Sequence, residues 1–379
     1  MRANETADIL VIGGGVIGLC VSRALALAHV GKVVLVERGE LGREASHAAA
    51  GMLAPQAEAN KADEFFTLCC RSRDLYPNFA AALLEETGID IELDQTGTLY
   101  CAFTQHDQQE IEQRYEWQTR AGLRVEQLTV HEARELEPNL ANNISGALRF
   151  PLDIQVENRQ LLLALTAANE RLGVKFSTGT TVESLQVERD RVVGVTTSRG
   201  FLAARSVVVS GGAWTSLIKT ENAAPQFCIE PVRGQMLCYD VSPALARHVI
   251  YSARGYLVPR RNGRLLAGST TEKVGFCKEV TESGVESIRK HACEIAPAIS
   301  SLSVVDSWAG LRPRAPDELP IIGKTNETEG LVFATGHYRN GILLAPITGE
   351  LIAGLIADNV VSPELQFCAP DRFAGATVG

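Results

Sequence analysis

The sequence lacks the features that would assign it to a membrane protein or to a disulfide-rich secreted protein. None of its 379 residues fall in an uninterrupted apolar run of about 18 or more, so no membrane-spanning helix is expected. Its nine cysteines are scattered apart from the neighbours Cys69 and Cys70, with no Cys-x-x-Cys motif and no metal-type spacing to histidine. These absences predict reduced thiols, no metal site and a cytoplasmic protein.

A secretory signal and a basic binding surface are missing as well. Glu5 and Asp8 precede the apolar N-terminal stretch, where a signal peptide would carry basic residues, and three glycines interrupt that stretch. The formal net charge is −9, which argues against nucleic acid or an anionic membrane as the main partner. We therefore expect neither partner.

No constellation typical of nucleophilic or paired-carboxylate catalysis stands out. Ser46 and His47 are neighbours in the sequence, and adjacent side chains on a helix or strand do not face each other usefully. The acidic residues fall on the expected faces of helices or in turns. The candidate chemistry therefore has to be sought elsewhere in the chain.

What the sequence does contain is a complete strand–turn–helix–strand pattern from Asp8 to Glu37. Gly13, Gly15 and Gly18 have the Gly-x-Gly-x-x-Gly spacing between a β-branched run and a helical run. In this motif the first glycine permits a tight turn, the second lets the backbone approach a pyrophosphate, and the third allows close packing of helix on strand. The helix N-terminus favours phosphate, and Glu37 is placed to accept hydrogen bonds from a ribose. The pattern predicts a bound dinucleotide without identifying which one.

Two further segments are rich in small residues. Residues 38–55 contain many alanines and glycines, which is compatible either with a small helix packed under a sheet or with close backbone approach to a planar ligand. A buried strand at 207–210 stops at Gly211 and Gly212, which suggests a ligand near the carboxyl edge of a parallel sheet.

The order of expected elements indicates an α/β protein with a discontinuous Rossmann-like domain and an inserted domain of antiparallel sheet plus helices. Alternating runs begin near residue 230, and Asn262-Gly263 is a hairpin signal between two of them. Residues 308–323 read as a loop-rich return segment, and 331–358 read as a strand, a glycine-rich turn and a helix that resume the first domain. We assign the dinucleotide domain to 1–88, 145–224 and 308–379, and the substrate domain to 89–144 and 225–307.

Arginines in glycine- and proline-rich turns are the strongest candidates for substrate binding. Arg312, Arg314 and Arg339 have this setting, and a rigidly held guanidinium matches a carboxylate. A surface position or a salt bridge is the alternative for Arg314 and Arg339. Tyr256 could donate a phenolic hydrogen bond or simply pack in the core. A helix expected to begin near residues 341–343 would direct its positive end toward the redox ring of a flavin and stabilise its reduced form.

Several motifs, in order and over nearly the whole chain, resemble the FAD-dependent glycine oxidases of thiazole biosynthesis, within the D-amino-acid oxidase and sarcosine oxidase family. They are VIGGGVIG (11–18), residues 43–53, VVVSGGAW (207–214), VRGQMLCY (232–239), GYLVPRRNGRLLAGST (255–270), WAGLRPRAPDELPIIG (308–323) and GHYRNGILLAPITGELIA (336–353).

The resemblance implies non-covalent FAD as the dinucleotide, since no cysteine is placed as in the covalent-flavin relatives. The Ala45-Ser46 pair departs from the pair of hydroxyl residues expected there, so only Ser46 offers a side-chain bond. The residues implied are Val16 and Ile17 at the pyrophosphate; Glu37 and Arg38 at the ribose; Val182 at the adenine; Ala45, Ser46, Ala50, Gly51 and Met52 along the flavin; and His337, Tyr338, Arg339, Asn340, Gly341, Ile342 and Leu343 around the isoalloxazine.

The same resemblance implies a reaction and its partners. Arg312, helped by Tyr256 and with Arg339 in the same pocket, would hold the carboxylate of glycine, sarcosine or a small D-amino acid while hydride passes to FAD. Oxygen would reoxidise the flavin with release of hydrogen peroxide, and the imine would enter the thiazole ring of thiamine or hydrolyse to glyoxylate and ammonia. A homo-oligomer and a thiazole-synthesis partner are expected.

Three other functions stay open from the sequence. They are a related D-amino-acid or sarcosine oxidase or a quinone-linked D-amino-acid dehydrogenase, a flavin-binding regulatory or scaffold protein without turnover, and an NAD-dependent dehydrogenase.

Overall fold

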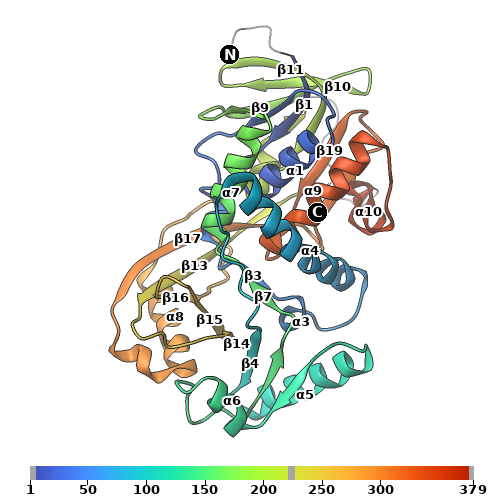
Figure 1. Ribbon diagram of the computed structural model, residues 1–379. Helices are drawn as coiled ribbons and strands as arrows, with labels where there is room; N and C mark the ends of the chain where they lie inside the picture. The colour runs from blue at the N-terminus through green and yellow to red at the C-terminus, as the bar shows by residue number, and fades with distance from the viewer. Residues whose placement is uncertain (1–5, 221–226, 375–379) are drawn as a thin grey trace.

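The computed structural model describes residues 6–220 and 227–374, which form two sheet-based halves (Figure 1). The first half is built on a nine-stranded sheet whose central strand β1 pairs in parallel with β2 on one side and β11 on the other. The strands of this sheet are β1 (Thr6–Ile12), β2 (Val33–Val36), β8 (Lys175–Ser177), β9 (Val182–Glu188), β10 (Arg191–Thr197), β11 (Gly200–Val209), β12 (Lys219–Thr220), β18 (Ile321–Lys324) and β19 (Leu331–Thr335).

Four long helices pack together against this sheet and bury its main apolar core (Figure 1). A parallel sheet needs such covering because its strands are apolar on both faces. The helices are α1 (Val16–Leu27), α4 (Glu64–Thr87), α7 (Asn158–Arg171) and α9 (Gly341–Ala357). The short turn η1 (Gly212–Leu217) follows β11, and α10 (Pro363–Cys368) and the turn η3 (Pro370–Phe373) follow α9.

Local signals set the ends of these helices. The Asp63 carboxylate accepts a hydrogen bond from the Phe66 N–H at 2.8 Å and caps α4, and Gly88, in a left-handed conformation at φ 76°, ends it. Helix α9 is apolar nearly all round, which is typical of a helix buried between other elements.

The second half is an eight-stranded sheet in the order β17-β13-β16-β15-β14-β4-β6-β5. Helices α5 (Gln105–Arg120), α6 (Val130–Leu136) and α8 (Glu282–Ile295), with the turn η2 (Pro297–Ser301), accompany it. The strands are β4 (Thr98–Ala102), β5 (Glu126–Leu128), β6 (Gly146–Phe150), β13 (Glu230–Asp240), β14 (Val249–Ser252), β15 (Gly255–Pro259), β16 (Arg264–Gly268) and β17 (Val304–Arg314).

Short elements connect the two halves (Figure 1). The ribbon β3 (Met52–Leu53) and β7 (Ile154–Gln155), with the small helices α2 (Ala45–Ala48) and α3 (Pro55–Glu58), lies between them, and β13 and β17 extend from one half toward the other. No helix in the described ranges has both the length and the apolar character needed to cross a bilayer.

The α/β fold is confirmed, and most expected elements appear, including α4, α7, β4, the parallel strand β8 and the β15–β16 hairpin around Asn262-Gly263. The expectation of a loop at 308–323 is wrong in its first half. Residues up to Arg314 belong to β17, which pairs antiparallel with β13. Glu230 lies opposite Arg314 at one end of this pairing, and Tyr239 lies opposite Val304 at the other. Pro313 is tolerated because β17 is an edge strand.

The sheets also divide the chain differently from the expected borders at 145 and 308. Strand β6 pairs with β4 and β5, and β17 pairs with β13, so both segments lie in the second sheet and not in the first. The second sheet is not wholly antiparallel either, because β14 and β4 run parallel. These pairings join segments far apart in the chain, which local patterns do not reveal.

Candidate active site

The glycine turn between β1 and α1 is shaped by two very close approaches. Gly13 has φ +102°, and a Cβ there would lie 2.4 Å from the Ser210 carbonyl oxygen. A Cβ on Gly18 would lie 1.9 Å from the Gly13 carbonyl oxygen. Only glycine fits these two positions, so both hold helix and strand together. Around Gly15, by contrast, a Cβ would meet only the Ser46 hydroxyl, at 3.3 Å, which leaves this side open to a ligand.

The open side of the turn presents groups suited to a nucleotide. Gly15 is the N-cap of α1 without a side-chain cap, and the first turn carries no acidic residue. The Val16 N–H donates to the Ser46 hydroxyl at 3.0 Å. Glu37 directly follows β2 and accepts hydrogen bonds of 2.8 Å from the N–H groups of Gly14 and Gly39, which fixes its carboxylate beside the turn. A helix N-terminus next to an oriented carboxylate fits a phosphate and a ribose.

One long cavity begins at this turn and ends at the second sheet. Its walls include every residue that the sequence predicted for the cofactor and the substrate, apart from Gly18, which packs inside the turn, and Arg314, which pairs with acidic residues. The predicted residues at the wall are Gly13, Gly15, Val16, Ile17, Glu37, Arg38, Ala45, Ser46, Ala50, Gly51, Met52, Val182, Tyr256, Arg312, His337, Tyr338, Arg339, Asn340, Gly341, Ile342 and Leu343.

The cavity wall near the start of α9 is fixed from behind by α4. The hydroxyl of Ser72 donates to the Leu343 carbonyl at 2.6 Å, and that of Tyr76 donates to the Ile342 carbonyl. Asn340, the N-cap, provides no side-chain bond, so the positive end of α9 points at the cavity uncapped. His337 is buried with Nε2 3.0 Å from the Thr348 hydroxyl, and burial lowers its pKa to about 3, so this wall has a neutral imidazole.

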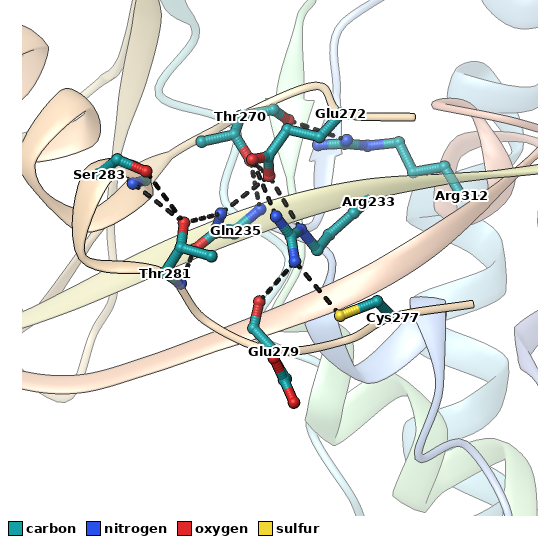
Figure 2. Close-up of polar contacts among 10 residues, drawn as sticks. Arg233, Gln235, Thr270, Glu272, Cys277, Glu279, Thr281, Ser283 and Arg312 are labelled. Carbon is teal, nitrogen blue, oxygen red and sulfur yellow. Dashed lines mark hydrogen bonds and ion pairs between the residues drawn. The ribbon is translucent and has the colours of Figure 1, made fainter. Parts of the chain in front are cut away.

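Arg312 enters the cavity from β17, and neutral groups orient it. Its Nη2 donates to the Ser269 hydroxyl at 2.7 Å. Its Nη1 donates to the Thr270 carbonyl at 3.1 Å, as Figure 2 shows. The guanidinium lies directly over Gly234 of the paired strand β13, where a Cβ would be 2.2 Å from Nη1. A glycine at this point of β13 is therefore required by the position of the arginine.

A second polar layer anchors the segment that supports Arg312 (Figure 2). Arg233 and Glu272 exchange two backbone hydrogen bonds and form a two-pronged ion pair of 3.0 Å on each side. Buried Gln235 donates from Nε2 to Glu272 at 2.8 Å and to the Thr281 hydroxyl at 3.0 Å. The Arg233 guanidinium, ahead of the other hydrogen-bond donors, lowers the pKa of Glu272 to about 2. Residues 269–281, which lack regular structure, are thereby tied to β13.

Arg339 faces the same cavity but has an acidic partner. Its Nε and Nη2 lie 3.2 and 3.3 Å from the two carboxylate oxygens of Glu58, and Nη2 is 3.3 Å from the Tyr251 hydroxyl. The Glu58 carboxylate is the main cause of the raised pKa of Arg339. Arg314 does not line the cavity, because it pairs with Glu230 and Glu318 at 2.9 Å each. Arg314 and Arg339 therefore both form the salt bridges that the sequence analysis gave as the alternative to substrate binding.

Tyr256 lies on β15 with its ring buried and its hydroxyl at the cavity wall. The hydroxyl is 3.3 Å from the sulfur of Met236, a weak acceptor that a stronger one can replace.

Four residues that line the same cavity were not predicted from the sequence: Gly234, Met236, Ser269 and Glu58. Gly234, Met236 and Ser269 lie within the motifs at 232–239 and 255–270, but no local pattern marks Glu58.

The whole arrangement fits FAD: a turn suited to phosphate and a carboxylate suited to a ribose at one end, small residues between 45 and 51 along the wall, and an uncapped helix end with two arginines at the other. In the described residues, no group of three or more metal-ligating side chains is present.

Comparison with known proteins agrees with this geometry. The family model described as "FAD dependent oxidoreductase" matches residues 8–355. The chain is 36% identical to a "Bifunctional protein ThiO/ThiG" of Trichormus variabilis over 97% of its own length, and it spans 55% of that relative, about half. It is 36% identical to a glycine oxidase of Pseudomonas aeruginosa, covering 92% of this chain and 94% of the relative.

One solved structure is similar to this chain over nearly the whole length of both proteins. The crystal structure of glycine oxidase from Geobacillus kaustophilus superposes with a TM-score of 0.92 at 34% identity, covering 97% of this chain and 99% of that one. The glycine turn, the cavity and these matches lead to one conclusion: the chain belongs to the FAD dependent oxidoreductase family, and FAD is its cofactor.

Proposed function

We propose that this protein oxidises glycine, and with it small amines such as sarcosine or small D-amino acids, to the imine, with oxygen as the final electron acceptor. The observation that carries the proposal is Arg312, an oriented guanidinium whose described partners in the cavity are all neutral. A guanidinium in this state favours a carboxylate, because a charge-assisted, two-pronged bond then replaces weaker neutral ones.

The chain's own residues contribute mainly orientation. Arg312 binds the substrate carboxylate, and the Tyr256 hydroxyl turns from the Met236 sulfur to donate a second hydrogen bond to it. The two contacts hold the amine and the α-carbon toward the wall formed by Met52 and the start of α9. When bound along this wall, FAD would supply the redox chemistry, which is uptake of a hydride from the α-carbon and transfer of the electrons to oxygen. Because His337 is neutral and no carboxylate of the described chain is free beside Arg312, orientation replaces a protein base.

The uncapped N-terminus of α9 adds electrostatic stabilisation. Its N–H groups and positive dipole end face the part of the cavity between Tyr338 and Leu343, which would hold the redox ring of FAD. A positive helix end favours the negative charge that builds up on reduction. Tyr76 and Ser72 hold this turn in place and so preorganise the field.

The fate of the product and the setting are part of the same proposal. The imine hydrolyses to glyoxylate and ammonia or is used in building the thiazole ring of thiamine, and relatives named ThiO/ThiG support a thiazole-synthesis partner. A cytoplasmic location and a homo-oligomeric state stay predictions.

The test is a peroxide assay on the purified yellow protein with glycine, sarcosine and D-alanine, combined with anaerobic reduction by glycine. We expect peroxide from glycine and loss of the flavin absorbance near ~450 nm. Reduction and peroxide with D-alanine but not with glycine would indicate a D-amino-acid oxidase. If glycine reduces the flavin without forming peroxide, and an added quinone reoxidises the flavin, the protein would be a dehydrogenase. A colourless protein that reduces NAD would overturn the proposal altogether.

A further inference from the structure

The arginines around the cavity differ in whether a carboxylate already holds them. Arg38 lies 2.5 Å from Glu44, Arg43 lies 2.9 Å from Glu40, and Arg339 is paired with Glu58. Of the arginines lining the cavity, Arg312 alone has no acidic partner among the described residues. The substrate end of the cavity therefore offers one unpaired positive charge.

Glu58 is held firmly in this position. It is the last residue of α3, a short helix whose Gln56 and Ala57 N–H groups donate to the buried Asp153 carboxylate at 3.2 and 2.8 Å. The Tyr251 hydroxyl also donates to Glu58, at 2.5 Å. The Glu58 side chain keeps 25% of its surface exposed, so the carboxylate forms part of the cavity wall.

We infer that Glu58 is a specificity-determining residue: by neutralising Arg339 it restricts the site to substrates with a single carboxylate. A substrate with two carboxylates would place one on Arg312 and leave the other without a free cation. Burying that second anion unpaired, beside Glu58, is unfavourable. This inference rests on the proposed function, in which Arg312 is the carboxylate anchor.

The inference also changes the role of Arg339. Its charge compensates Glu58 and does not bind the substrate directly. Loss of Arg339 alone then leaves the Glu58 charge uncompensated in the cavity, which should repel a substrate carboxylate. Loss of both charges together should remove that repulsion.

The experiment compares acetate and malonate, unreactive mono- and dicarboxylates, by titrating the flavin spectrum of the holoenzyme. The first variant is Glu58→Gln, because glutamine keeps an acceptor for the Tyr251 hydroxyl and removes only the charge. We expect the ratio of malonate to acetate affinity to rise by about tenfold, the scale of one charged hydrogen bond. Iminodiacetate should gain as a substrate relative to glycine in the same variant.

Two further variants provide the controls. Arg339→Gln should weaken the binding of both anions, and the double variant Glu58→Gln/Arg339→Gln should recover acetate binding while losing the gain for malonate. An unchanged malonate-to-acetate ratio in Glu58→Gln, or a gain that persists in the double variant, would overturn the inference. Because the anion titration requires no turnover, its result is separate from whether glycine is oxidised. Retained yellow colour and thermal midpoint show that each variant is folded.

Discussion

Arg312 and Arg339 line one cavity from different elements, and their surroundings differ. Arg312 comes from the edge strand β17 and is bound by a hydroxyl and a backbone carbonyl, so its charge stays available. Arg339 comes from the turn before α9 and is bound by Glu58, so its charge is compensated within the protein. Two arginines with the same kind of sequence setting thus have different electrostatic roles. The partner of an arginine, more than its position, decides whether it can bind a substrate.

The supporting layers differ in the same way. Behind Arg312 lies the ion pair of Arg233 and Glu272, which contacts Arg312 only through the backbone of the segment it anchors. This arrangement orients a cation without neutralising it. Beside Arg339 the carboxylate contacts the guanidinium itself. Three predictions address this comparison.

The largest effect is expected for Arg312→Ala. If Arg312 is the carboxylate anchor, the KM for glycine should rise by about 100-fold or more, because a two-pronged charged bond is lost. The flavin spectrum should be retained, since the nucleotide end is untouched. Arg314→Ala on the same strand is the matched control, because its partners Glu230 and Glu318 lie away from the cavity. Equal KM values for glycine in the Arg312→Ala and Arg314→Ala variants would refute the role of Arg312 as the carboxylate anchor.

An intermediate effect is expected for Gly234→Ala. The new methyl group would lie 2.2 Å from Nη1 of Arg312, so the guanidinium must leave its present position. We expect the KM for glycine to rise by roughly tenfold with FAD retained, because misplacement weakens orientation without removing the charge. Gly354→Ala, within α9 and without neighbouring atoms within 4 Å, is the control for the substitution itself. A wild-type KM in Gly234→Ala would show that the stacking over Gly234 does not matter.

The smallest effect is expected for Glu272→Gln, which weakens the supporting ion pair. We expect a KM increase of only a few-fold with kcat little changed, because the backbone bonds between Arg233 and residue 272 persist. A fall in kcat with unchanged KM would contradict a role in positioning Arg312.

The same variant also tests the pH dependence of stability. The Arg233 guanidinium lowers the pKa of Glu272 from 4.5 to about 2. A carboxyl with a lowered folded-state pKa contributes stability that is present above its ordinary pKa and is lost as pH falls from about 4.5 toward 2. Denaturant midpoints measured over this range should fall less steeply for Glu272→Gln than for the unaltered protein. Parallel curves would mean that the ion pair contributes nothing.

The cofactor end of the molecule was largely predictable from sequence. Gly13, Gly15 and Gly18 are separated by a few residues within one turn, so their spacing determines their geometry. Glu37 follows the next strand and reaches the turn because neighbouring parallel strands end at the same edge. The long motifs made FAD the expected dinucleotide, and the family match agrees.

The substrate end was predictable only in part. Tyr256, Arg312 and Arg339 were expected near one pocket, and they line one cavity. The strand character of residues 308–314 was missed because the density of proline and arginine in 308–323 suggested a loop, while edge position in a sheet depends on distant pairing. The pairing of Glu58 with Arg339 joins residues 281 positions apart, and no local pattern could reveal it.

The sequence by itself therefore determined the dinucleotide turn, the α/β architecture and the identity of the candidate arginines, because these depend on short spacings and local periodicity. Only the tertiary structure decided which arginine keeps a free charge. That choice depends on the pairing of β13 with β17, on the anchored segment 269–281 and on the position of α3 beside the turn that precedes α9. Charge compensation acts over a few ångströms in space, whatever the separation along the chain.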